Sequence, residues 1–249
     1  MKSSENWNFY ALRVDGSPAS NCVDIGVADA APVPGFGTLS FLSVKMNMPR
    51  PDGLSSNEEF ETLSQIESTL QAFVDPSPSL RYVGRSTHDG GRDFFFYSKG
   101  DELGAVAEHM VAAWPGYEFS HGSQPDPDWG VYWRFLYPSA EDFQRMGNRD
   151  VLEQLRIHGD DHAVPREIDH YAVFEAGGDV EGFMAALPDT LVGEALVNED
   201  ADGTTTVAFK TFGCPADIDD LTIDLFRAAK DHGGDYDGWG CVAVPSQCN

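Results

Sequence analysis

Basic residues are scarce in this sequence: 16 Lys and Arg stand against 41 Asp and Glu, which gives a formal net charge of −25. Residues 1–137 carry 9 basic against 18 acidic residues, and residues 138–249 carry 7 against 23. Such a surface repels phosphate backbones, so we expect no direct binding of nucleic acid. It favours a basic protein partner, with the alternative that the acidic balance only keeps the protein in solution.

Cysteines are few, and long apolar runs are missing. Cys22, Cys214, Cys241 and Cys248 show no paired C-x-x-C spacing, so the sequence predicts neither a zinc site nor a redox motif. No window has the apolar length of a membrane span, and the first residues do not resemble a signal peptide. We therefore expect a cytoplasmic protein with reduced thiols, no cofactor and no membrane association. Serine-nucleophile motifs and H-E-x-x-H are absent, so no catalytic residue and no metal ligand is predicted.

The length of 249 residues fits two ordinary domains, and a hydrophobic content of 41% is ample for packed cores. Pro138 separates a strand pattern from a helix pattern that begins at Ser139. We therefore place one domain at residues 1–137 and the other at residues 138–249. Both mix strands with helices, which predicts the α+β class.

The first domain is expected to be an antiparallel sheet with two helices. A hairpin signal occurs at Asp15-Gly16, and a capping box at Ser56-Asn57-Glu58-Glu59 begins a helix that Pro76 ends. A second helix is expected over residues 102–113. The first helix should bury Phe60, Leu63, Ile66, Leu70 and Phe73. We expect strands over residues 7–14, 17–27, 39–48, 81–87, 92–98, 117–120 and 131–137.

Three stretches of this half carry a family resemblance. They are Trp7 with Asp15-Gly16-Ser17-Pro18-Ala19, then residues 82–87 (YVGRST), then residues 91–97 (GRDFFFY). The first half thereby resembles domain of unknown function 695, a family without an established activity. The resemblance supports the domain boundary and implies no chemistry.

The second domain is expected to begin with a helix from Ser139 to about His158, which Gly147-Asn148 could break. The elements that follow are a strand over 168–175, a helix over 180–187, strands over 190–198 and 204–211 joined at Asp202-Gly203, a helix from Asp217 and a strand over 239–244. The order βαββαβ is that of a ferredoxin-like sandwich. In that fold the last strand lies beside the first, which would bring Trp239 near His170.

The last thirty residues are the most specific part of the sequence. Ile218, Leu221, Leu225 and Ala229 recur on one helix face, and Gly233-Gly234 ends the helix. A turn with the signature Asp235-Tyr236-Asp237-Gly238-Trp239-Gly240 is then expected.

This signature, together with Cys214, residues 216–219 and Arg166-Glu167-Ile168-Asp169-His170, resembles the regulator of ribonuclease activity B (RraB) family over residues 140–245. Members of that family bind ribonuclease E and inhibit it. The sequence has no long acidic tail after Val244, so we do not expect an inhibition that depends on such a tail.

Several residues allow two interpretations. Asp235, Asp237 and His170 could form a metal or acid–base cluster, whereas turn hydrogen bonds for the aspartates and a buried hydrogen bond for His170 are the structural alternative. Trp239 could pack in the core or contact a partner. Arg85 and Arg92 beside a hairpin tip could bind an anion or be exposed arginines. His162 and Arg166 are expected to be solvated loop charges.

The sequence therefore predicts a non-enzymatic, acidic regulatory protein that binds a protein partner, ribonuclease E or another basic protein. The candidate contact residues are Asp235, Tyr236, Asp237, Gly238, Trp239, Gly240 and His170. One alternative is a hydrolase or metal-dependent enzyme with a carboxylate/His site in the second domain. Another is an interaction module unrelated to RNA decay.

Overall fold

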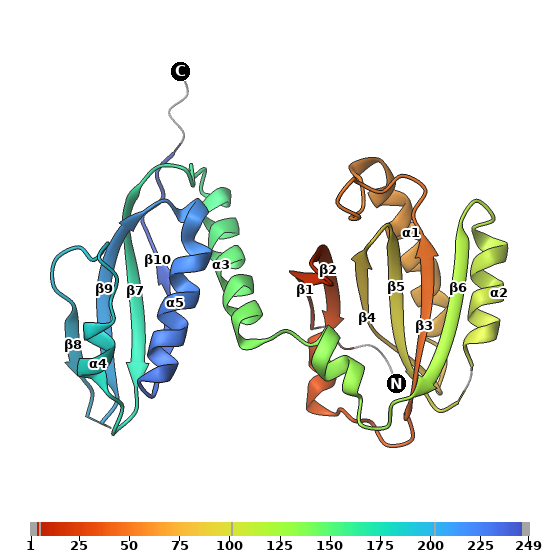
Figure 1. The fold of residues 1–249 in the computed structure, drawn as a ribbon, viewed down its shortest axis with the longest axis horizontal. Helices are drawn as coiled ribbons and strands as arrows, with labels where there is room; N and C mark the ends of the chain where they lie inside the picture. The colour runs from red at the N-terminus through yellow and green to blue at the C-terminus, as the bar shows by residue number, and fades with distance from the viewer. Residues whose placement is uncertain (1–3, 5, 101, 202, 246–249) are drawn as a thin grey trace. The chain divides into compact units, whose positions relative to one another are not determined.

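The computed structural model describes residues 4, 6–100, 102–201 and 203–245 (Figure 1). The chain divides into two compact units, residues 1–138 and 139–249. Each unit combines one antiparallel sheet with helices, so the protein is α+β. Cys248, and Asp202 of the predicted turn, lie outside the described residues.

The first unit contains a six-stranded sheet in the order β1-β2-β4-β5-β3-β6, with every pair antiparallel. Its predicted hairpin is present, because Asp15 and Gly16 both have positive φ between β1 and β2, as a tight two-residue turn requires. The elements are β1 (Trp7–Val14), β2 (Ser17–Asp24), a 3-10 helix (Ile25–Asp29), β3 (Thr38–Lys45), α1 (Asn57–Val74), β4 (Leu80–His88), β5 (Gly91–Ser98), α2 (Leu103–Ala113) and β6 (Glu118–Pro125).

Helices α1 and α2 cover one face of this sheet (Figure 1), and the largest core of the unit lies between them and strands β3, β4 and β5. Helix α1 buries Leu63, Ile66 and Leu70 as expected. The prediction for Phe60 and Phe73 is wrong, since they are 54% and 41% exposed. The buried face is rotated toward Glu59 and Val74.

Glu59 explains this rotation of α1. Its side chain does not complete a capping box with Ser56, the residue before the helix. It is buried and accepts hydrogen bonds from the backbone N–H groups of Asn47, at 2.7 Å, and Met48, at 2.8 Å. A buried carboxylate needs such donors. The helix therefore presents Glu59 to the loop after β3.

The predicted strand over residues 131–137 is wrong: Tyr132–Leu136 form a π-helical turn. On the second face of the sheet, Phe135 of this segment packs against Phe95 at 5.8 Å between ring centroids, and the preceding Trp129 stacks on Tyr97 at 3.9 Å. Asp126 accepts hydrogen bonds from the Tyr97 hydroxyl, at 2.6 Å, and from the N–H groups of Gly130 and Val131. These bonds hold the segment in a helical conformation.

The second unit contains a four-stranded antiparallel sheet in the order β10-β7-β9-β8. The side chains on one sheet face form a single core with the three helices. The elements are α3 (Ala140–Ile157), β7 (Arg166–Phe174), α4 (Val180–Ala185), β8 (Leu196–Glu199), β9 (Thr205–Gly213), a 3-10 helix (Pro215–Asp217), α5 (Ile218–Asp231) and β10 (Gly234–Gly240).

Helix α3 is continuous through Gly147-Asn148, so these two residues do not break the helix. A capping box begins the helix: Ser139 accepts a hydrogen bond from the N–H of Asp142, and the Asp142 carboxylate accepts one from the N–H of Ser139. Asn148 is buried and forms tertiary contacts that its local sequence does not predict.

Two strand predictions in this unit need correction. The strand expected over 190–198 is interrupted at Gly193, which has φ +71, and only Leu196–Glu199 form β8. The last strand is β10 at residues 234–240, rather than 239–244, because Gly233 with φ +76 ends α5 and leads directly into it. The Tyr/Trp/double-Asp signature thus lies on a strand and not in a turn.

Candidate functional site

Strand β10 pairs with β7, and Trp239 lies opposite His170, so these two residues are neighbours as expected. A β-bulge occurs between Tyr236 and Gly238, where φ of Gly238 is +118. In a regular strand, residues three apart point to opposite faces. The bulge adds one residue, so Tyr236 and Trp239 both enter the helix-covered core.

His170 is fully buried on that face. Its Nδ1 lies 2.7 Å from the Tyr236 hydroxyl, and its Nε2 lies 2.8 Å from Oγ1 of Thr211. Burial lowers the pKa of His170 to about 4 and raises the pKa of the Tyr236 hydroxyl. The imidazole is therefore neutral at pH 7, and both of its nitrogens are engaged within the core, which leaves neither free for a metal or a substrate.

Trp239 is 8% exposed, and its indole N–H donates to Oδ1 of Asn148 at 2.9 Å. The amide nitrogen of Asn148 donates to Oγ1 of Thr222 and to the carboxylate of Asp219, each at 2.7 Å. Asn148 thus links α3, α5 and β10 through side-chain hydrogen bonds. Sequence patterns do not predict this role, because a lone Asn within a helix pattern carries no signal of burial.

Asp235 and Asp237 alternate with the buried Tyr236 and are exposed. Asp235 forms an ion pair with Lys230 of α5. Turn hydrogen bonds were expected for the two aspartates, but these residues lie on a strand. The candidate contact segment therefore offers the carboxylates of Asp235 and Asp237 to solvent, while Tyr236, Trp239 and His170 are turned inward.

The sheet face opposite the helices is exposed, and we call it the open face. The β7 residues Glu167, Asp169 and Tyr171 alternate with the buried residues Ile168 and His170. A hollow of about 310 Å³ lies over the part of this sheet formed by β7, β8 and β9. Its lining residues are Asp169, His170, Tyr171, Val192, Gly193, Glu194, Leu196, Ala208, Phe209 and Lys210.

Arg166 is buried, so its prediction as a solvated loop charge is wrong. Its guanidinium forms an ion pair with Asp160 and donates to the carbonyl of Val242 at 3.0 Å. Asp160 also accepts a hydrogen bond from the N–H of Val244 at 2.6 Å. These contacts connect the chain after β10 to the loop before β7, which gives Arg166 a structural role.

Arg85 and Arg92 are not the exposed hairpin arginines that the sequence allowed. Arg92 is 2% exposed and donates to Oγ1 of Thr87 at 3.0 Å. Glu67 of α1 lies 2.7 Å from Arg85 and 3.7 Å from Arg92. Burial, with Arg85 nearby, lowers the pKa of Arg92 to about 10. The anion beside these arginines is thus a carboxylate of the same chain.

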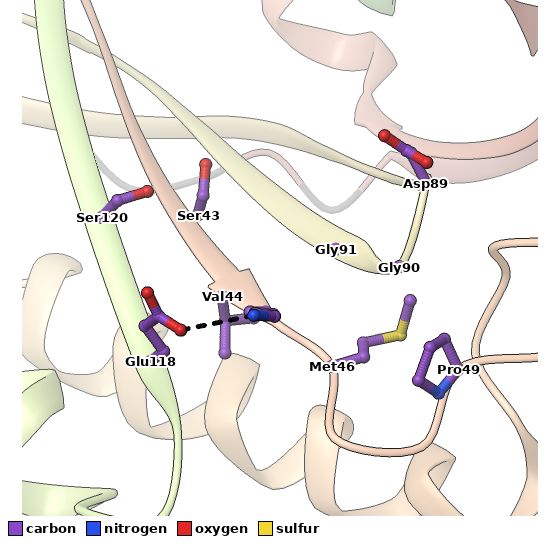
Figure 2. A pocket seen from close by; sticks show the side chains of 10 residues that line it. Ser43, Val44, Met46, Pro49, Asp89, Gly90, Gly91, Glu118 and Ser120 are labelled. Atoms are coloured by element: carbon purple, nitrogen blue, oxygen red, sulfur yellow. Dashed lines mark ion pairs between the residues drawn. The ribbon is translucent and has the colours of Figure 1, made fainter.

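The first unit also has a shallow cavity of about 410 Å³ near the β4–β5 hairpin (Figure 2). Figure 2 shows Ser43 and Ser120 on neighbouring strands. Glu118 forms an ion pair with Lys45 at 3.6 Å. Ser43 donates to Asp93. Two of the polar lining groups are thus paired within the chain, Glu118 with Lys45 and Ser43 with Asp93.

Neither a metal site nor a membrane-spanning helix occurs among the described residues. No group of three or more His, Cys, Asp and Glu side chains there could hold a metal ion. Within that same part of the chain, no helix is both long enough and apolar enough to cross a membrane.

The fold and the site define a class: an α+β protein of two units, with an exposed acidic sheet face in the second. The chain belongs to the Family of unknown function (DUF695), whose model matches residues 5–137. Residues 145–241 match the family Regulator of ribonuclease activity B.

No curated protein matches the chain. Among solved structures, it is similar to an unknown protein from Galdieria sulphuraria at 11% identity, covering 83% of this chain and 99% of the other. The TM-score is 0.25, which is too low to support an argument about fold.

Proposed function

We propose that this chain is a non-catalytic regulatory protein that binds ribonuclease E, or a basic protein like it, through the second unit. The observation that carries the proposal is the match of residues 145–241 to the regulator of ribonuclease activity B family. The carboxylates of Asp235 and Asp237 are exposed on β10 and add local negative charge. Charge of this kind steers a basic partner toward the surface.

Within the proposed contact segment the residues divide by role. Asp235 and Asp237 meet the partner. Tyr236, Trp239 and His170 fix the position of β10 from inside the core, and Gly238 provides the bulge. Gly240 lies opposite Asp169 at the end of the strand. Trp239→Ala would therefore disturb folding as well as binding, which makes the two aspartates the better probes of the contact.

The structural part of the proposal concerns architecture. We infer that residues 138–249 form a ferredoxin-like domain preceded by helix α3, and that residues 1–137 form the other domain. The order β10-β7-β9-β8 and the sequence of elements βαββαβ support the first inference. The two family matches, to residues 5–137 and 145–241, support the second.

The test is an assay of ribonuclease E cleaving a fluorescent RNA oligonucleotide, with binding measured in parallel at several salt concentrations. The chain should bind the enzyme and slow cleavage, and affinity should fall as salt rises. The double change Asp235→Asn, Asp237→Asn should weaken binding about fivefold at low salt.

A matched control for that double change is Asp220→Asn with Asp224→Asn. These two aspartates are also exposed, but they lie on α5. The control removes the same charge and should leave binding close to that of the unchanged chain. Absence of binding, or equal weakening by both pairs, would contradict the proposed contact.

A further inference from the structure

Several large apolar side chains on the open face of the second sheet are exposed to solvent. Tyr171 is 43% exposed, Leu196 is 65% exposed and Phe212 is 56% exposed. Ala208 pairs with both Tyr171 and Leu196, so the side chains of these three residues lie on one face. Phe212 lies four residues after Ala208 on β9 and shares that face. A single exposed apolar residue is ordinary, whereas a group on neighbouring strands marks a candidate interaction surface.

Part of this apolar group lines the hollow described above. Tyr171, Leu196 and Ala208 contribute apolar atoms to it, and the segment Val192–Glu194 borders it. Its volume of about 310 Å³ is near the lower end of ordinary ligand pockets. It therefore has room for one bulky side chain of a bound peptide.

Negative charge surrounds the hollow. Asp169 and Glu194 line it, and Glu167 pairs with Phe212 in the strand register. Lys210 is the one basic side chain among the described lining residues, and it lies 2.9 Å from Glu167 and 3.5 Å from Asp169. Lys210 therefore partly neutralises two carboxylates that would otherwise attract a cationic ligand.

We propose that the hollow binds an extended basic segment of a protein partner, with one bulky apolar side chain inserted between Tyr171 and Leu196. Arg or Lys side chains on either side of the inserted residue would meet Asp169, Glu167 and Glu194. Charge complementarity selects this occupant: a second copy of the chain presents the same negative surface, and nucleic acid is repelled. The choice of a protein partner rests on the proposed function.

The probe is a fluorescein-labelled peptide of nine residues, with four arginines, serine spacers and a central leucine, measured by fluorescence anisotropy against the full chain. One comparison peptide has serine at the centre, and another has glutamates in place of the arginines. Replacing the leucine should weaken binding about tenfold, because its buried apolar area is lost. The glutamate peptide should not bind.

Variants locate the peptide on the open face. Leu196→Ser should weaken binding of the leucine peptide about fivefold. Val197→Ser is the matched control, since Val197 is the next residue of β8, is 47% exposed and points to the opposite face. Lys210→Gln should tighten binding about threefold, because it frees Glu167 and Asp169.

Equal binding of the leucine and serine peptides would overturn the inference, as would equal effects of Leu196→Ser and Val197→Ser in variants with unchanged circular dichroism. A dimer of the chain alone that Leu196→Ser dissociates would assign the surface to a second copy and would also overturn it. If the peptide binds as expected while ribonuclease E is neither bound nor inhibited, the proposed function fails and the peptide site stands.

Discussion

The two sheets differ in the kind of polar group that they bury. The first sheet buries charge: Arg92 with Glu67, and Arg81 with Asp24 at 3.6 Å. The second sheet buries neutral groups at its centre, where His170 bonds to Tyr236 and Thr211, and its buried ion pair, Arg166 with Asp160, lies where β7 begins.

This contrast indicates which charged groups of each unit can interact with other molecules. A buried charge needs a partner within its own chain, because desolvation is otherwise too costly. The arginines of the first sheet are occupied in that way. On the open face of the second sheet, Glu167 and Asp169 share Lys210 and Glu194 is exposed, so negative charge remains there for a basic partner.

The largest expected effect comes from breaking the charged interior of the first unit. Glu67→Gln removes the counterion of Arg85 and Arg92 and should lower the free energy of unfolding of that unit by about 3–5 kcal/mol. Hydrogen exchange, resolved by peptide, measures each unit separately. Glu61→Gln on the exposed side of α1 is the control and should change stability by less than about 0.5 kcal/mol. Similar results for both changes would show that the buried pairs contribute little.

The next effect concerns pH and the neutral interior of the second unit. The pKa of His170 is about 4 in the folded protein, below the ordinary histidine value of 6.5, so the unfolded chain takes up the proton first as pH falls. The contribution of neutral His170 to the free energy of unfolding is complete above pH 6.5. It falls by about 3 kcal/mol as pH falls from 6.5 to 4. Urea unfolding, followed by pulsed hydrogen exchange in peptides of the second unit, measures it.

His170→Gln should remove most of that pH dependence while lowering stability at pH 7. The matched control is His121→Gln, because His121 is exposed on β6 of the first unit. An unchanged slope between pH 6.5 and 4 in His170→Gln would show that another group causes the loss.

The smallest effect tests whether Asn148 joins the helices to the sheet. Asn148→Ala leaves the indole N–H of Trp239 without its acceptor and should lower stability by about 2 kcal/mol. Gln144→Ala, one turn earlier, removes only a donor to the same amide oxygen and should cost less than about 0.5 kcal/mol. Thermal unfolding of the two variants makes the comparison, and equal shifts in Tm would exclude a linking role for Asn148.

The sequence by itself determined most of the elements and both family resemblances. Apolar spacing is local, so it predicted α5 and the pairing partners β4 and β5, and the turn at Asp15-Gly16 followed from residues that favour positive φ. The βαββαβ order also predicts that Trp239 lies beside His170, and the two residues are paired in the sheet.

Tertiary structure decided which side chains of those elements are buried. The bulge before Gly238 turned Trp239 into the core, Glu59 rotated the buried face of α1, and Asp126 made a helical turn of an aromatic run that reads as a strand. The last two outcomes depend on polar contacts of Glu59 and Asp126, and the first depends on a bulge in β10. Hydrophobic periodicity carries no record of such contacts, which is the physical reason that the open face emerged only from the folded chain.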